Sequence, residues 1–119
     1  MDKVAVITGA ARGIGLATAR KFIAEDWRVV MIDIDGANQI AAREGLIRES
    51  NEASGKTLAI ECDVSDPAQV ADAIKKALDE FGRIDALVNN AGIAVFKPVT
   101  ETTYEEWSRV LAVNLSGPF

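Results

Sequence analysis

Histidine is absent from the 119-residue sequence, and cysteine occurs only once, at Cys62. Without histidine, these residues cannot supply a histidine general base or a histidine-ligated metal, and we expect no metal site. A single cysteine cannot form an internal disulfide, which favours a reducing compartment. Cys62 lies in the apolar run "TLAIECDV", so we interpret it as a buried small side chain rather than a nucleophile.

Basic residues are in the minority, with 13 Lys and Arg against 18 Asp and Glu, for a net charge of −5. This balance argues against a nucleic-acid or anionic-membrane surface, because both need clustered basic residues. No apolar run approaches the roughly 20 residues that cross a bilayer. The sequence passes from Met1 to "VAVIT" without a signal-peptide pattern. We therefore expect a cytoplasmic protein with no nucleic-acid or membrane partner.

The apolar residues that are present fall into short runs separated by longer amphipathic segments. The runs are nearly continuous, as in parallel strands covered on both faces, and they span residues 4–7, 29–32, 58–60 and 86–92. The connections are long enough for the helices that parallel strands require, which we expect over residues 14–25, 37–52 and 66–82. A last helix is expected from "TYEEW" onward, where Thr103 and Glu106 can form a capping box.

This alternation predicts one α/β domain over residues 1–119. With right-handed crossovers, the strands form a Rossmann-type, doubly wound parallel sheet in a three-layer arrangement, with the strands in the order 3-2-1-4.

A glycine-rich stretch, "TGAARGIGLATA", directly follows the first strand, with Gly9, Gly13 and Gly15 spaced as G-x-x-x-G-x-G. Glycines let the backbone approach a ligand closely. The helix that starts near Gly13 directs its unpaired N–H groups and positive dipole end at the same space, which suits a pyrophosphate. A tight turn that binds nothing is the alternative, and the position between a strand and a helix favours the binding site.

A carboxylate ends the second strand at Asp33, 18 residues after Gly15. At this place a carboxylate can accept hydrogen bonds from an adenosine ribose. Asp35 fits the spacing equally well, and either residue could instead be an exposed turn or cap carboxylate. We prefer Asp33 because it directly follows the apolar run.

Four motifs occur in order along the chain: "TGAARGIG" (8–15), "DV" (63–64), "NNAG" (89–92) and "VNL" with Asn114. In these motifs and their spacing the sequence resembles the short-chain dehydrogenases/reductases. The resemblance implies an NAD(P)-dependent oxidoreductase that transfers a hydride between a nicotinamide cofactor and an alcohol or carbonyl substrate.

The resemblance also implies which residues bind the cofactor. Asp63 would accept from the adenine amino group while Val64 covers an edge of the base, and Ile93 would continue toward the nicotinamide. One Asn of "NNAG" would also tie neighbouring strands together. The implied cofactor-binding residues are Gly9, Arg12, Gly13, Ile14, Gly15, Asp33, Ile34, Asp63, Val64, Asn90, Ala91, Gly92 and Ile93.

The charge of Asp33 favours NAD over NADP. A carboxylate facing a 2′-phosphate is a like-charge contact that costs several kcal/mol. Arg12 could pair with that phosphate, but an exposed ion pair contributes only about 0–1 kcal/mol. Repulsion should dominate, so we expect NAD, with NADP less favoured.

Asn114 is the catalytic residue that the resemblance places in this sequence. The family uses Ser, Tyr and Lys for proton transfer, with an Asn whose backbone carbonyl holds a water. Pro118, four residues later, has no N–H to donate to that carbonyl. A plain helix kink, or a solvent-facing Asn, is the alternative.

The family's Ser and Tyr-x-x-x-Lys do not occur here, because Tyr104 is the only tyrosine and Ser108 stands four residues after it. Family members are roughly twice as long, and the apolar face that runs from Trp107 to Phe119 resembles an unfinished helix. We therefore expect Phe119 to be a truncation point and these residues to be inactive alone.

Two alternative functions and one partner are also considered. A non-catalytic dinucleotide-binding protein or fragment is the main alternative to an enzyme, and a methyltransferase is disfavoured by "NNAG" and the glycine spacing. In the family the last helix packs against its counterpart in another subunit, so we also expect a homo-oligomer, a dimer or a tetramer.

Overall fold

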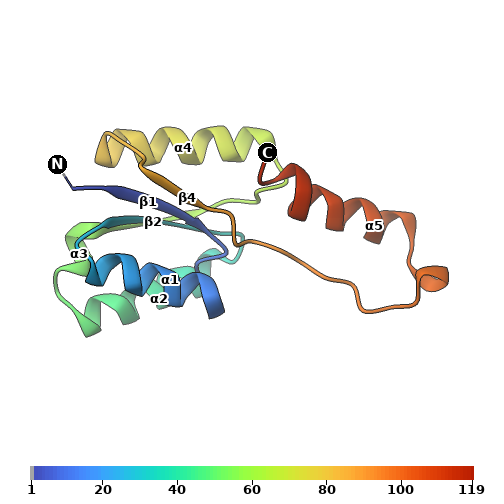
Figure 1. Ribbon diagram of the computed structural model, residues 1–119, viewed down its shortest axis with the longest axis horizontal. Coiled ribbons are helices and arrows are strands. Elements are labelled where there is room, and N and C mark those ends of the chain that lie inside the picture. The colour runs from blue at the N-terminus through green and yellow to red at the C-terminus, as the bar shows by residue number, and fades with distance from the viewer. Residues whose placement is uncertain (1) are drawn as a thin grey trace.

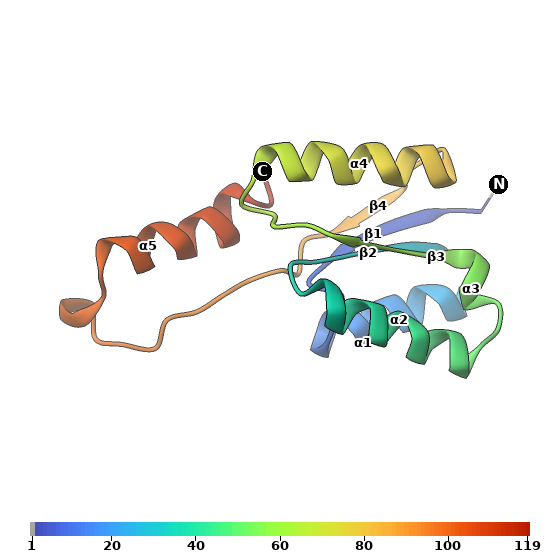
Figure 2. The ribbon, with the colours of Figure 1, turned by 180° about the vertical axis from the view of Figure 1, so that it is seen from behind.

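The computed structural model describes residues 2–119 as a parallel sheet with helices on both faces (Figures 1 and 2). Helix α4 covers one face of the sheet, and α1, α2 and α3 cover the other. The elements in chain order are β1 (Val4–Thr8), α1 (Gly13–Ala24), β2 (Arg28–Asp33), α2 (Gly36–Glu49), α3 (Ala53–Lys56), β3 (Thr57–Glu61), α4 (Pro67–Phe81), β4 (Ala86–Val88), a 3₁₀ turn (Val99–Glu101), α5 (Tyr104–Leu111) and a π-helical turn (Ala112–Ser116).

The four strands pair in the order β3-β2-β1-β4, and every pairing is parallel. This confirms the expected Rossmann-type sheet with its strands in the order 3-2-1-4. All four strands therefore end at the same edge, and the segments that follow them meet there. In such sheets a ligand binds outside the carboxyl ends of the strands.

Burial along the strands differs between the centre and the edges of the sheet. All five residues of β1 and four of the six in β2 are buried, as expected for strands covered on both faces. The same expectation is wrong for β3 and β4, which are only partly buried. Leu87 in β4 is 53% exposed, because β4 pairs on one side only, with β1.

The core consists of two apolar layers, one on each side of the sheet. Alternate residues of β1 and β2 point to opposite faces, as the twofold period of a strand requires. Val4, Val6, Val30 and Ile32 pack with Ala73, Ala77 and Phe81 of α4. Ile7, Val29 and Met31 pack with Ala19 of α1 and Leu46 of α2.

Three helix ends follow the local sequence signals. Asp66 caps α4, where its side chain accepts from the backbone N–H of Ala68 at 3.0 Å, and Gly82 ends it in the left-handed conformation with a φ of 79°. Thr103 and Glu106 form the predicted capping box at the start of α5.

Two predicted boundaries are wrong. The segment 37–52 is not one helix, because α2 ends at Glu49 and the extended backbone of Ser50 separates it from the short α3. The fourth strand ends at Val88 rather than continuing to residue 92. The backbone N–H groups of Asn90 and Ala91 both donate to the Thr8 hydroxyl at 3.0 Å, which turns "NNAG" into a loop.

The last helix does not continue its apolar face to Phe119. After Leu111 the helix widens, and the N–H of Gly117 donates to the carbonyl of Ala112, five residues earlier, at 2.9 Å. Val113 in this turn is buried, and Phe119 after it is fully exposed. The connection from β4 and α5 extend away from the sheet, which gives the molecule extents of 50 × 26 × 21 Å (Figure 1).

No helix among residues 2–119 combines the length and the apolar character that crossing a bilayer requires.

Candidate functional site

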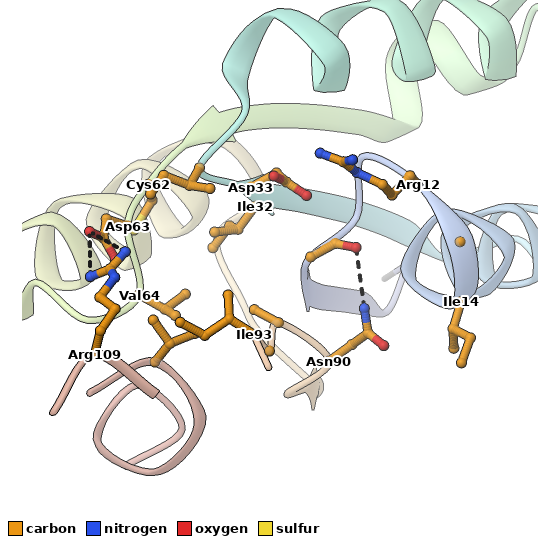
Figure 3. Close-up of a pocket in the computed structure, with 16 residues that line it drawn as sticks. Arg12, Ile14, Ile32, Asp33, Cys62, Asp63, Val64, Asn90, Ile93 and Arg109 are labelled. Carbon is orange, nitrogen blue, oxygen red and sulfur yellow. Dashed lines mark hydrogen bonds and ion pairs between the residues drawn. The ribbon is translucent and has the colours of Figure 1, made fainter. Parts of the chain in front are cut away.

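A cavity of about 500 Å³ lies at the carboxyl edge of the sheet (Figure 3). Pockets of this size hold small molecules and cofactors. The loop between β1 and α1, the ends of β2 and β3, the loop after β4 and the helix α5 all contribute. The lining residues are Gly9, Arg12, Gly13, Ile14, Ile32, Asp33, Ile34, Cys62, Asp63, Val64, Asn90, Ala91, Gly92, Ile93, Arg109 and Val113.

The lining contains every implied cofactor-binding residue except Gly15. Four further lining residues were not anticipated from the sequence: Ile32, Cys62, Arg109 and Val113. Cys62 is only 2% exposed, and burial raises the pKa of its thiol. Its place among the buried core residues confirms the expectation of a buried small side chain.

The glycine loop leaves open space in front of α1. Gly13 begins the helix with a φ of +56°, and a Cβ placed on it would meet no atom within 4 Å. The N-cap residue Arg12 is extended, and its side chain makes no capping hydrogen bond. The first-turn N–H groups of a helix have no intrahelical partner, so the start of α1 presents donors to an anion that enters this space.

Gly15 has a different function from Gly13. A Cβ on Gly15 would overlap the carbonyl oxygen of Gly9, and it would lie 2.7 Å from Nδ2 of Asn90. Gly15 is buried behind the cavity, where it lets α1 pack directly against the loop. The structure thus shows a packing role for Gly15 and does not place it in the cavity lining.

Asp33 holds the glycine loop and also faces the cavity. Its Oδ2 accepts from the backbone N–H of Ala11 at 3.0 Å, and its Oδ1 accepts from the N–H of Asp35 at 2.9 Å. Asp35 is not in the lining. Its side chain caps α2 by accepting from the N–H of Asn38 at 3.1 Å and pairs with Arg12 at 3.3 Å. Of the two carboxylates that the spacing left open, Asp33 is the one that a ligand in the cavity can reach.

Asn90 connects the loop after β4 to the loop after β1. Its Nδ2 donates to the carbonyl oxygen of Thr8 at 3.2 Å. It also donates to the carbonyl oxygen of Gly9 at 3.2 Å (Figure 3). The hydroxyl of Thr8, which is 7% exposed, accepts from the N–H groups of Asn90 and Ala91. Asn90 is thus the Asn that ties neighbouring strands together. Thr8 was missed, although a hydroxyl at the end of an otherwise apolar strand was a visible signal.

Asp63, just after β3, is surrounded by donors. Its Oδ1 accepts from the N–H of Ser65 at 3.0 Å and from the hydroxyl of Ser65 at 2.7 Å. Its Oδ2 accepts from Nη1 and Nη2 of Arg109, each at 3.3 Å. The hydrogen bonds from Ser65, with the charge of Arg109, lower the pKa of the Asp63 carboxyl. The group is therefore an anion near neutral pH.

The side chain of Asn114 forms two hydrogen bonds with the backbone of the segment that follows "NNAG". Its Nδ2 donates to the carbonyl of Ile93 at 2.8 Å, and its Oδ1 accepts from the N–H of Ile93 at 2.9 Å. Asn114 lies in the π-helical turn, outside the cavity lining. Such widened turns often occur at functional sites. This two-point contact was not foreseen, because the resemblance drew attention to the backbone carbonyl of Asn114.

Comparison with known proteins identifies the family of this chain. The sequence profile described as "short chain dehydrogenase" matches residues 3–119, so the chain belongs to the short chain dehydrogenase family. D-threitol dehydrogenase from Mycolicibacterium smegmatis is 42% identical over 119 residues, which cover 98% of this chain and 44% of that protein. The chain thus spans less than half the length of this curated relative.

Solved structures of similar proteins contain both forms of the nicotinamide cofactor. A short chain dehydrogenase/reductase from Burkholderia phymatum in complex with NAD aligns with a TM-score of 0.90 at 33% identity, over 98% of this chain and 40% of its own. A metagenomic short-chain oxidoreductase in complex with NADP aligns with a TM-score of 0.88 at 37% identity, over 98% of this chain and 51% of its own.

Proposed function

We propose that this chain is the cofactor-binding part of an oxidoreductase that moves a hydride between a nicotinamide dinucleotide and an alcohol or carbonyl substrate. The observation that carries the proposal is the cavity, in which the open start of α1 at Gly13 lies beside the carboxylate of Asp33. The N–H groups at the start of α1 can donate hydrogen bonds to a pyrophosphate, and the Asp33 carboxylate can accept them from ribose hydroxyls.

The strand order sets the direction of the dinucleotide along the sheet edge. The pyrophosphate would lie at the end of β1, and the adenosine ribose at the end of β2. The adenine would then lie further along the same edge, at Asp63 and Val64 after β3. The nicotinamide half would run the opposite way, past Ala91 and Gly92 to Ile93. The bound cofactor supplies the hydride, and these residues hold and orient it.

The proton-transfer part of the reaction has no counterpart among these residues. Tyr104 is the only tyrosine, it is 84% exposed, and it lies on α5 outside the cavity. We therefore expect no hydride transfer from the 119 residues alone. The same observation supports the second candidate, a non-catalytic dinucleotide-binding protein.

Asp33 supports NAD as the cofactor. Its carboxylate lines the cavity, and Arg12, the candidate partner for a 2′-phosphate, is paired with Asp35 in the structure. A 2′-phosphate would meet the Asp33 carboxylate, a like-charge contact that costs several kcal/mol. Replacing Asp33 with Ser should therefore remove most of a preference for NAD. An unchanged preference in D33S would show that another group sets it.

Two further proposals concern the surroundings of the protein. The apolar residues exposed on and after α5, Trp107, Leu111 and Leu115, support a homo-oligomer. The single, buried cysteine supports a reducing, cytoplasmic location.

A calorimetric titration tests the proposed function. We expect saturable 1:1 binding of NADH and no binding of S-adenosylmethionine, which carries an adenosine but no pyrophosphate. Binding of S-adenosylmethionine alone would favour a methyltransferase and contradict the proposal. Turnover of NADH with a carbonyl substrate by these 119 residues would contradict the expected lack of activity.

A further inference from the structure

The acceptor sites of the Asp63 carboxylate are already filled by the protein. A carboxylate has about four lone-pair sites on its two oxygens. At Asp63, Ser65 supplies two donors to Oδ1, and Arg109 supplies two to Oδ2. A purine amino group that approaches Asp63 must therefore displace one of these donors.

The two pairs of contacts are unequal, and Arg109 is the weaker partner. The contacts from Ser65 are 2.7 and 3.0 Å long and come from a residue two positions away in the chain. Those from Arg109 are 3.3 Å long, at the outer limit for a hydrogen bond, and come from α5. The Arg109 side chain is 44% exposed, so water can replace any contact that it loses.

A second acceptor keeps Arg109 in place when it releases Asp63. Its Nη1 donates to the hydroxyl of Ser65 at 2.6 Å, which is shorter than either contact with Oδ2. The guanidinium would therefore stay at the cavity wall, and the N–H groups released from Oδ2 of Asp63 would be free to donate to a ligand. Figure 3 shows the Asp63 carboxylate and the Arg109 guanidinium next to each other at the cavity wall. A ligand that separates them would therefore meet a carboxylate oxygen and N–H donors at the same place.

Resting on the proposed function, we propose that Arg109 is a specificity-determining residue for the purine base. Together, Arg109 and Asp63 form a site that can hydrogen-bond either an amino group or a carbonyl group at position 6 of the purine. An amino group donates to Oδ2 of Asp63. A carbonyl oxygen, as in hypoxanthine, accepts from the Arg109 guanidinium.

The test compares NADH with reduced nicotinamide hypoxanthine dinucleotide, in which a carbonyl replaces the amino group. Their dissociation constants are measured by calorimetry for the unaltered chain and for R109M. We expect the unaltered chain to bind the two within about threefold of each other, and R109M to prefer NADH by about tenfold or more, because the carbonyl then faces a carboxylate with no donor. The bases also differ at N1, and this difference is common to both proteins, so the change in the ratio isolates Arg109.

The matched control is R20M. Arg20 is also an exposed arginine paired with a carboxylate, Glu49, at 2.8 Å, but it lies outside the cavity. We expect R20M to give the same ratio as the unaltered chain.

Three results would overturn the proposal. The first is that the ratio of the two dissociation constants is the same in R109M as in the unaltered chain, with binding of both ligands weakened equally. Arg109 would then have only a structural role. The second is that the unaltered chain binds NADH more than about tenfold more tightly than the hypoxanthine dinucleotide. This result does not depend on the folding of any variant. The last is failure of both ligands to bind, which would overturn the proposed function as well, whereas the first two leave it intact.

Discussion

Replacing Gly15 with Ala should damage both the fold and the binding site, although Ala normally favours a helix. Gly15 is the third residue of α1, where Ala is intrinsically better than Gly by about 1 kcal/mol. Here the added Cβ would overlap the Gly9 carbonyl oxygen and approach Nδ2 of Asn90 to 2.7 Å. The first of these atoms belongs to the backbone, so no side-chain rotation can relieve the overlap.

The expected cost follows from what must move. Either α1 shifts away from the loop, or the loop moves and breaks the 3.2 Å bond from Asn90 to Gly9. Overpacking of this kind costs about 1–3 kcal/mol, and we expect a net loss near the upper end, about 3 kcal/mol. For a domain of this size, that loss corresponds to a fall in the melting temperature of about 10 °C.

The assay is thermal and urea unfolding followed by circular dichroism, with G55A as the matched control. Gly55 lies exposed in the short helix α3, and a Cβ there would meet no atom within 4 Å. G55A should leave the stability unchanged or raise it by up to about 1 kcal/mol. If G15A were as stable as G55A, the close packing of the glycine loop would be refuted.

The remaining predictions concern α5 and the groups that it positions. T103A should destabilise α5 by about 1 kcal/mol, because the capping box with Glu106 is lost. The loss should be measured as faster hydrogen exchange of the backbone amides in α5. The pKa of the Asp63 carboxyl is lowered by folding, so its contribution to stability is present above the unfolded-state pKa and is lost as the pH falls through the folded-state pKa. In D63N, the free energy of unfolding should therefore fall less steeply as the pH is lowered through this range. N114A should speed amide exchange at Ile93, whose N–H loses its acceptor, and an unchanged rate would contradict the role of this contact.

The sequence predicted the features that depend on local chemistry. The strand order follows from four short apolar runs and the handedness of their connections. The caps at Asp66 and Thr103 and the stop at Gly82 were readable because each depends on residues within a turn of one another. The position of the glycine loop and of Asp33 beside a cavity was predictable because strands of such a sheet all end at the same edge.

The sequence did not predict the contacts that join distant segments. Asp63 and Arg109 are separated by 46 positions, and an arginine on an amphipathic helix is an ordinary surface residue until the fold brings a carboxylate to it. The hydrogen bonds between Asn114 and Ile93 likewise form only because the loop after β4 passes beside the π-helical turn. The close packing of Gly15 against Gly9 was not predicted, because spacing alone does not show which atoms a glycine contacts.

The central claim is that a nicotinamide dinucleotide binds across the carboxyl edge of the sheet. The most direct measurement is a titration of the ¹⁵N-labelled chain with NADH, followed by amide chemical shifts. The account predicts saturable shifts at Gly13 and Ile14, at Asp33 and at Asp63, with none in the second half of α2. Shifts that are absent, or that cluster around Trp107 on α5 instead, would contradict it.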